Sequence, residues 1–223
     1  MRMRARYILD VDEEATPIDA ELTRLLQLAE ALSSGGAGAH AVATLLKSFG
    51  PGIDLDAIIP GYTASFGRME RRDGSARYTL LPHYLREAQA DPDAVERSWW
   101  AGALLTLGDA LAEANYLDRA PELELIYHLR NAVAHGNKVS LTGGGRTRLQ
   151  RWPANNFEAY QRSDPVELTI ADEGAPVLFD MLRPADLADL FDSVAQYVAC
   201  LRTDTLGYRW WMRENDWPWP GAV

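Results

Sequence analysis

Residues 125–137 have the sequence Leu-Ile-Tyr-His-Leu-Arg-Asn-Ala-Val-Ala-His-Gly-Asn, which predicts the end of an amphipathic helix. At 100° per residue, one arc is apolar and predicts the buried face: Leu125, Ile126, Leu129, Ala132 and Val133. The opposite arc is polar and carries Glu124, His128, Asn131 and His135. Proline suits a first helical turn and glycine suits a left-handed cap, so the helix is expected from Pro121 to Gly136.

Three polar residues near this helix end are the candidate site. Arg130 lies at the flank of the apolar arc, about 140° around the helix from His135. It either pairs with a buried acid or reaches along a helix interface, and Asp109 or another acid is open as the partner. His135 falls in the last turn, where unpaired carbonyls stabilise a cation. Asn131 lies one turn earlier and can hydrogen-bond the imidazole or a substrate oxygen.

A second long helix is expected just before this one. Asp91-Pro92 is a helix start, and apolar residues follow near one face: Val95, Trp99, Ala103, Leu107, Ala110 and Ala114. The linker around Tyr116–Ala120 is short, so the two helices should pack in an antiparallel pair.

The flanking segments are expected to add helices and hairpins. Before residue 91, the pattern predicts a helix from Thr16-Pro17 to Gly35-Gly36 and a second from about Gly38 to Phe49. Residues 53–81 leave a hairpin and a helix both open, and the turn signal at 71–75 is compatible with a short hairpin. After Gly136, the period changes to two. This predicts a hairpin of 138–142 with 146–152, another of 166–170 with 177–181, and a last helix from Arg183-Pro184.

These elements predict a mostly α (α+β) fold: one domain over residues 1–223, a helical bundle with β-hairpin additions. The segment Leu206–Val223 holds four of the seven tryptophans. They either hold the C-terminus against the body or form a base-stacking platform for single-stranded nucleic acid.

Charge and motif content narrow the chemistry. The chain has a net charge of −10, but residues 127–163 carry six basic side chains and one acidic one, a local +5 that can hold a phosphate backbone. Cys200 is the only cysteine, which excludes an internal disulfide and a cysteine zinc site. No P-loop, G-x-S-x-G or H-E-x-x-H motif is present, and the four histidines lack metal-ligand spacing. A magnesium site made of carboxylates alone stays open.

Localisation follows from the apolar pattern. No apolar run approaches the ~18 residues that a spanning helix needs. The basic opening Met1–Arg6 lacks the apolar core of a signal peptide, since Tyr7-Ile8-Leu9 leads directly into acidic residues. The sequence therefore predicts a soluble, cytoplasmic protein with no membrane partner.

The segment Arg130–Asn137 resembles the R-x4–6-H signature of the HEPN superfamily (higher eukaryote and prokaryote nucleotide-binding domains). It is most similar to the R-N-x-x-A-H-G form of prokaryotic defence and plasmid-borne members. The preceding helix, with Trp99–Leu104, fits the family's core helical hairpin. The resemblance covers about 91–137, and it implies a HEPN-like antiparallel bundle in which this hairpin bears the motif.

The resemblance also implies a function. Many HEPN proteins are metal-independent endoribonucleases whose motif residues line a cleft across a homodimer; here the catalytic residues would be Arg130, Asn131 and His135. The nearby basic residues are the RNA-binding candidates: Lys138, Arg146, Arg148 and Arg151. No metal or cofactor is expected. The expected partners are RNA, a second copy of the chain, and an antitoxin or nucleotidyltransferase in a defence or toxin-like system.

Other HEPN branches are non-catalytic, so a second interpretation remains open. In it the chain binds RNA or a nucleotide, or regulates a neighbouring protein, without cleaving anything. A helical scaffold unrelated to HEPN proteins is the third alternative.

Overall fold

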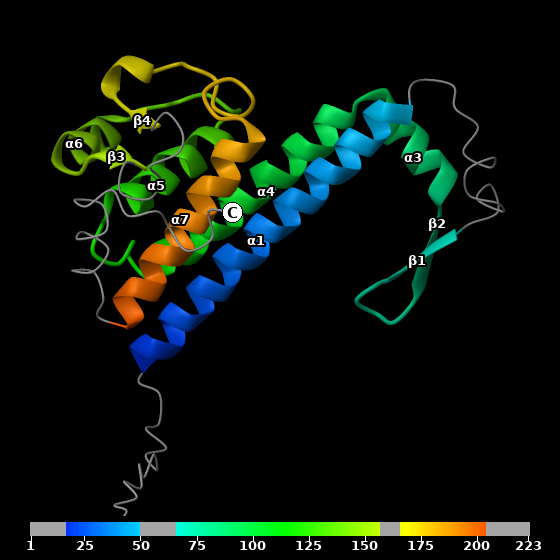
Figure 1. Cartoon of the computed structure of the whole chain (residues 1–223), viewed down its shortest axis with the longest axis horizontal. Coiled ribbons are helices and arrows are strands. Elements are labelled where there is room, and N and C mark those ends of the chain that lie inside the picture. Colours follow the sequence, from blue (N-terminus) through cyan, green and yellow to red (C-terminus); the bar gives the residue numbers. More distant parts are fainter. Residues whose placement is uncertain (1–16, 50–65, 157–165, 204–223) are drawn as a thin grey trace, which may run out of the picture.

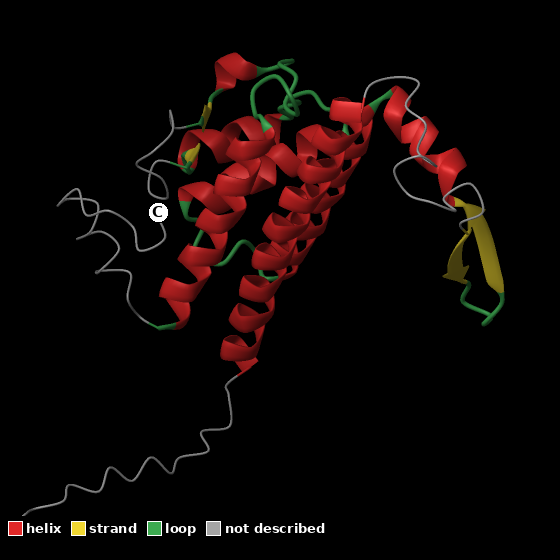
Figure 2. Cartoon of the chain, turned by 45° about the vertical axis from the view of Figure 1, so that its right-hand side comes forward, coloured by secondary structure: helices red, strands yellow, loops and turns green. Residues whose placement is uncertain are grey.

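The computed structural model describes residues 17–49, 66–156 and 166–203. Thr16, Arg162, the N-terminal segment and the tryptophan-rich segment Leu206–Val223 lie outside the described residues. The predicted mostly helical class with small two-stranded sheets is confirmed (Figures 1 and 2). The elements are α1 (Pro17–Phe49), β1 (Phe66–Glu70), β2 (Ala76–Leu80), α3 (Leu81–Ala90), α4 (Pro92–Glu113), α5 (Pro121–Ala134), α6 (Gly143–Arg151), β3 (Ala154–Asn155), β4 (Glu167–Leu168), the 3₁₀ turn η2 (Ile170–Asp172) and α7 (Pro184–Arg202).

Helix α1 is the longest element and runs antiparallel to both α4 and α7 (Figure 1). Near its start, Arg24 lies 3.1 Å from Glu113 at the end of α4. Near its end, Lys47 lies 2.5 Å from Asp93 at the start of α4. Ion pairs at both ends therefore fix the register of the two helices, although exposed pairs of this kind add little stability.

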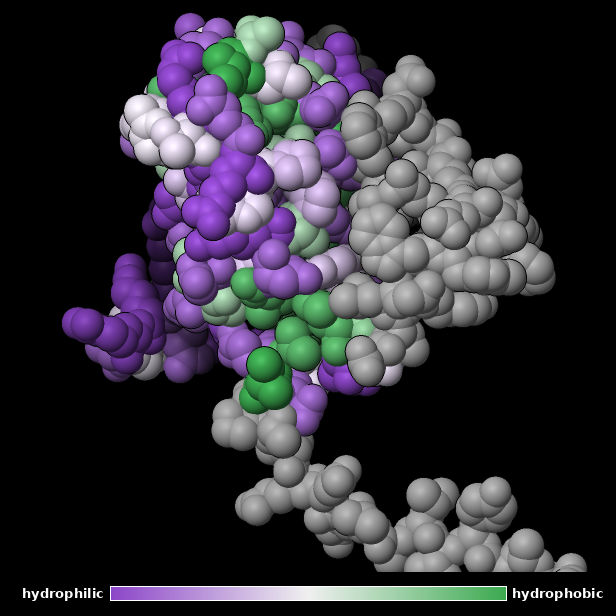
Figure 3. Space-filling model, turned by 90° about the vertical axis from the view of Figure 1, so that its left-hand side faces the viewer, coloured by the Kyte–Doolittle hydropathy of each residue, from purple (hydrophilic) through white to green (hydrophobic). Residues whose placement is uncertain are grey.

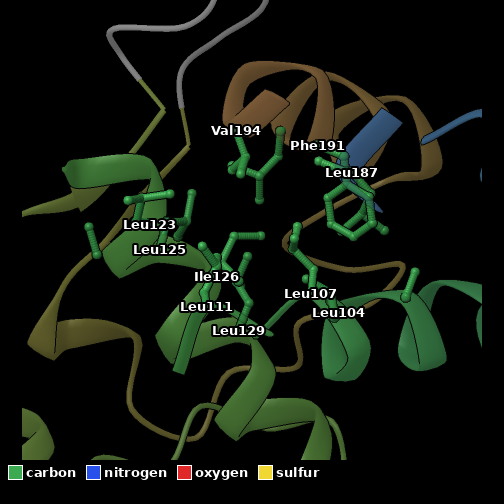
Figure 4. Close-up of a cluster of buried hydrophobic side chains, with 14 of the residues drawn as sticks. Leu104, Leu107, Leu111, Leu123, Leu125, Ile126, Leu129, Leu187, Phe191 and Val194 are labelled. Carbon is green, nitrogen blue, oxygen red and sulfur yellow. The ribbon is translucent and has the colours of Figure 1, made fainter. Parts of the chain in front are cut away.

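The core lies where α4, α5 and α7 meet (Figure 4). Each helix contributes fully buried apolar side chains to it: Leu104, Leu107, Leu111, Leu123, Leu125, Ile126, Leu129, Leu187, Phe191 and Val194. Burying one such side chain stabilises the fold by about 1.5–3 kcal/mol. The expected helices at 91–114, 121–136 and 183 onward are confirmed, and most residues of their apolar arcs face this core. Trp99 is the exception: it was expected on the apolar face of its helix but is 40 % exposed.

Helix α1 continues through Gly35 and Gly36, so the expected helix end there is wrong. A Cβ on Gly35 would overlap the indole of Trp99, and one on Gly36 would overlap the indole of Trp100. The two glycines therefore admit the tryptophans of α4 against the backbone of α1. Close helix packing, rather than chain termination, accounts for their position.

Of the two alternatives left open for 53–81, the structure shows a hairpin around the turn at 71–75: β1 and β2 pair in antiparallel register, with Phe66 opposite Leu80. Its turn places Gly74 at φ +79°, and the amide of Ser75 donates to the Asp73 carboxylate at 2.9 Å. Helix α3 follows directly and was not predicted. Figures 1 and 2 show that α3 and the hairpin extend away from the helical bundle.

The hairpin expected over 138–152 is wrong, because residues 143–151 form helix α6. Thr142 caps it: the Thr142 hydroxyl accepts from the amide of Gly145 at 3.2 Å. The three glycines thus form the first turn of a helix and not a strand connection. Their low helix propensity is offset by the cap and by contacts that α6 makes with α5.

The second expected hairpin, 166–170 with 177–181, is also wrong. Strand β4 pairs instead with β3, with Leu168 opposite Ala154. Thr169 then caps the short turn η2, in which Asp172 completes a capping box. Within 177–182, Leu178 and Leu182 form an isolated β-bridge.

Among the described residues, no helix has both the length and the apolar character of a membrane span.

Candidate active site at the end of helix α5

The end of α5 is fixed by its cap and by a loop from later in the chain. Gly136 has φ +88° and Asn137 has φ +63°, so the chain turns sharply as the glycine cap predicted. The Asn137 side chain holds Leu178 from both sides: its carboxamide donates to the Leu178 carbonyl at 3.3 Å and accepts from the Leu178 amide at 2.8 Å. No structural role was expected for Asn137 from the sequence. Asparagine tolerates the left-handed conformation, so an asparagine directly after a helix cap is the local pattern that could have predicted this turn.

Arg130 is paired with Asp109, the acid that the sequence left as a candidate. The guanidinium Nε and Nη2 donate to one carboxylate oxygen of Asp109, at 2.9 and 2.6 Å. The arginine stem crosses α4 at Gly108, where an added Cβ would lie 2.5 Å from the Cγ of Arg130. Gly108 therefore lets the arginine lie against α4, with its side chain 32 % exposed.

Asn131 contacts the same guanidinium. Its side-chain oxygen accepts from Nη1 of Arg130 at 3.2 Å, and the residue is half-buried. Its backbone carbonyl accepts from the amide of His135 at 3.1 Å, which places His135 one turn further along the helix. His135 is exposed, and within the described residues its imidazole makes no hydrogen bond, ion pair or ring contact. The structure thus brings Arg130 and Asn131 into contact and places His135 one helical turn after Asn131, open to solvent.

This arrangement leaves hydrogen-bonding capacity unused. A guanidinium has five N–H groups, and three of those of Arg130 are engaged by Asp109 and Asn131. One N–H on each terminal nitrogen remains, enough to hold two oxygens of a phosphate. Neutral imidazole can accept a proton and imidazolium can donate one, so an exposed imidazole such as that of His135 is chemically able to act as an acid or a base.

The basic residues after α5 divide into two groups. Lys138, Arg146 and Arg151 are exposed, although Arg146 pairs with Glu173 at 3.0 Å and Arg151 stacks on Trp152. The side chain of Arg148 is only 16 % exposed and lies against α5. The structure therefore places three of the four RNA-binding candidates at the surface and turns the fourth inward.

Arg148 is held by a buried cluster that the helical wheel did not predict. Its Nε and Nη2 donate to the two oxygens of Glu124 at 2.5 and 2.8 Å, and its guanidinium stacks on Tyr127 at 3.6 Å. Glu124 is fully buried and His128 nearly so, at 0 % and 4 % exposure. Both were expected on the polar arc opposite the buried face, yet both are buried, because α6 packs over this part of the arc while His135 on the same arc stays exposed.

Burial changes the titration of two groups in this region. It lowers the pKa of His128 to about 4, with a further lowering from the charge of Arg148. Burial also raises the pKa of Tyr116 to about 12, while its hydroxyl donates to the carbonyl of Gly108 at 3.1 Å. His128 is therefore a neutral packing residue.

Figure 3 views the molecule from the side on which α5 and α6 lie in Figure 1, and this face is mainly hydrophilic. Within the described ranges, no three His, Cys, Asp or Glu side chains gather into a group that could hold a metal ion.

No protein-family model, curated protein or solved structure matches the chain. The likeness to HEPN proteins therefore depends on the motif at 130–137 and on the helical hairpin that carries it.

Proposed function

We propose that the chain is a HEPN-type, metal-independent endoribonuclease that acts in the cytoplasm as a homodimer with a defence or toxin-like role. The observation that carries the proposal is that one helix end presents both a guanidinium and an exposed imidazole. Arg130 keeps two N–H groups available, and His135 has an exposed imidazole one turn from Asn131. In this proposal α4 and α5 are the motif-bearing hairpin of a HEPN-like bundle.

The proposed chemistry uses the RNA's own nucleophile. A neutral His135 imidazole accepts the proton of a ribose 2′-hydroxyl, and the 2′-oxygen attacks the adjacent phosphorus. The bond from phosphorus to the 5′-oxygen breaks, and an imidazolium donates a proton to the leaving 5′-oxygen. The products are a 2′,3′-cyclic phosphate end and a 5′-hydroxyl end. The guanidinium of Arg130 stabilises the charge that develops on the phosphoryl oxygens.

A second copy of the chain supplies what one helix cannot. The reaction needs one imidazole as base and another as acid, and a two-fold axis places two copies of the motif at one groove. The exposed cations Lys138, Arg146 and Arg151 would then hold the RNA strand beside the cut, against the overall charge of −10. An antitoxin or nucleotidyltransferase is proposed as a further partner on the motif resemblance alone.

The test is cleavage of mixed RNA by the pure full-length chain in EDTA. Wild type should give 2′,3′-cyclic phosphate ends, and both His135→Ala and Arg130→Ala should abolish cleavage. Arg130→Lys keeps the charge without the planar fork, so it should recover only a small part of the activity. Arg86→Ala, an exposed arginine on α3, is the matched control and should cleave like wild type.

Thermal unfolding and mass complete the experiment. The His135→Ala variant should unfold within a few degrees of wild type, since the imidazole makes no contact within the described residues. Light scattering should give twice the 24.8 kDa chain mass. Cleavage that persists in His135→Ala, or a monomer that cleaves fully, would contradict the proposed site.

The pairing of Arg130 with Asp109 favours one second candidate. An arginine already neutralised by a carboxylate suits a non-catalytic HEPN module that binds RNA or a nucleotide, or regulates a partner. This alternative predicts saturable RNA or nucleotide binding that Arg130→Ala weakens, with no cleavage under any condition. The same variants therefore distinguish the two functions.

A further inference from the structure

A second candidate site lies at the other end of the bundle, between α1, α4 and the start of α7. A pocket of about 340 Å³ opens there, within the range of small-molecule sites. Trp100, which helps to line it, is nine residues before Asp109 on α4 (109 − 100), or about 13 Å along the helix axis. The pocket is therefore separate from the motif at the end of α5.

The walls are apolar and rigid. Ala37 of α1, Trp100 of α4, and Pro184 and Ala188 of α7 form much of the lining. The ring of Trp100 is held edge-on against Phe191 at 5.7 Å, and Trp100 is 1 % exposed. Small residues on α1 and α7 leave the volume unfilled while the tryptophan keeps its shape. Such a preformed apolar cavity suits a flat or short-chain organic group.

Two side chains with N–H donors, Arg183 and His40, complete the lining, and no carboxylate is among the described lining residues. Arg183 is exposed, and its guanidinium makes no hydrogen bond or ion pair within the described residues. The His40 imidazole is held by a buried carboxylate: its Nδ1 lies 2.7 Å from Glu96, whose side chain is 2 % exposed. A buried carboxylate needs a charged or hydrogen-bonding partner, and His40 provides one. This fixes the imidazole at the pocket although 57 % of its side chain is exposed, and its Nε2 lies 3.5 Å from the Thr44 hydroxyl, a long contact that a ligand carboxylate would replace.

The start of α7 adds to the positive character. Arg183 is the residue before the helix and Pro184 is its first residue, so the positive end of a 19-residue helix dipole lies at the pocket. The Asp186 carboxylate accepts from the Arg183 amide at 2.8 Å and offsets part of this charge, so the Arg183 guanidinium is the main positive group. The lining therefore combines an apolar interior with positive charge on one side. Its complement is an apolar molecule with one negative group.

We propose that this pocket binds a small organic acid, with the apolar body of the ligand against Trp100 and Ala188 and its carboxylate at Arg183 and His40. Arg183 binds the carboxylate through its planar fork. Glu96 does not touch the ligand; it is a positioning residue that orients His40.

Calorimetric titration of the full chain tests the proposal with naphthalene-2-carboxylate and octanoate as probes, and naphthalene-2-carboxamide as the neutral control. Both acids should bind saturably at one site per chain, and the amide at least roughly tenfold more weakly, because it lacks the charge that Arg183 pairs with. Arg183→Gln should weaken naphthalene-2-carboxylate to the level of the amide. Ala188→Phe, which fills the cavity, should abolish binding of all probes, and Arg86→Gln should change nothing.

Three results would overturn the proposal: no saturable binding of either acid, equal binding of acid and amide, or wild-type binding by Arg183→Gln. Arg183 is exposed, so its substitution tests the site even if Ala188→Phe does not fold. Glu96→Gln separates positioning from contact. It should weaken binding of the acids without changing binding of the amide, whereas a purely structural role would affect all probes together.

Discussion

The guanidinium of Arg130 meets the carboxylate of Asp109 through a single oxygen, with Nε and Nη2 at 2.9 and 2.6 Å from Oδ1. This geometry fixes the direction of the arginine. With Asn131 bonded to Nη1, one N–H on each terminal nitrogen has no partner among the described residues. Asp109 therefore orients Arg130 in addition to neutralising it. The pair lies at the surface, with side chains 32 % and 59 % exposed, so its contribution is to geometry more than to stability.

Asp109→Ala should lower RNA cleavage roughly tenfold or more, because a misdirected guanidinium stabilises the transition state poorly. Asp109→Asn retains an acceptor oxygen and should recover much of the rate. Both variants remove a negative charge, so RNA should bind at least as tightly as to wild type. Single-turnover cleavage rates and RNA-binding titrations measure the two effects separately. Loss of binding together with rate would contradict an orienting role.

The two ion pairs of α6 should contribute very different amounts to the free energy of unfolding. Arg148→Met removes two short hydrogen bonds from the fully buried Glu124 carboxylate and leaves it only Arg119, at 3.4 Å, so it should cost up to about 3–5 kcal/mol in the free energy of unfolding. Arg146→Met, on the same helix, breaks only the exposed pair with Glu173 and should cost less than about 1 kcal/mol. Urea unfolding measures both. Similar losses of unfolding free energy in the two variants would contradict a buried ion pair between Arg148 and Glu124.

The long central helices could be predicted because their signals are local. Pro121 and Gly136 mark the start and end of α5, and the 3.6-residue apolar period marks the side that faces the core. The continuation of α1 through Gly36 depends on Trp100, which comes from a different helix. No local pattern carries that information, and glycine pairs usually end helices.

The same distinction applies to the candidate site. Arg130, Asn131 and His135 were identified from a motif within one helix, and they do lie at one end of α5. The inward turn of Arg148 could not be predicted, since it follows from covering Glu124 with a helix that the sequence pattern assigned to a hairpin. Charge counts along the chain do not distinguish a buried arginine from an exposed one.

His128 should make the fold weaker in acid. Its pKa is lowered to about 4 in the folded chain, whereas the unfolded chain takes up the proton near pH 6.5. Above pH 6.5 both states are neutral and the group has no effect. As the pH falls from 6.5 toward 4, the unfolded state binds more protons, so stability falls, by about 2 kcal/mol between pH 7 and pH 5.

The measurement is urea unfolding of wild type and His128→Leu at pH 7 and pH 5. Contributions from the other titrating groups are common to both proteins, so the difference in pH dependence isolates His128. The variant should lose about 2 kcal/mol less than wild type over this interval. An equal loss in the two proteins would mean that His128 is protonated in the folded state at pH 5.

Two glycines of α1, two positions apart, should respond to alanine in opposite directions. Gly38→Ala meets no atom within 4 Å, so the higher helix propensity of alanine should stabilise the chain by roughly 0.5–1 kcal/mol. Gly36→Ala gains the same propensity but drives a methyl group into the indole of Trp100, which is buried and held by Phe191. Overpacking of this kind costs about 1–3 kcal/mol, so the net change should be destabilising. Thermal unfolding of the two variants is the measurement, and a stabilised Gly36→Ala would show that α1 and α4 are not packed as closely as described.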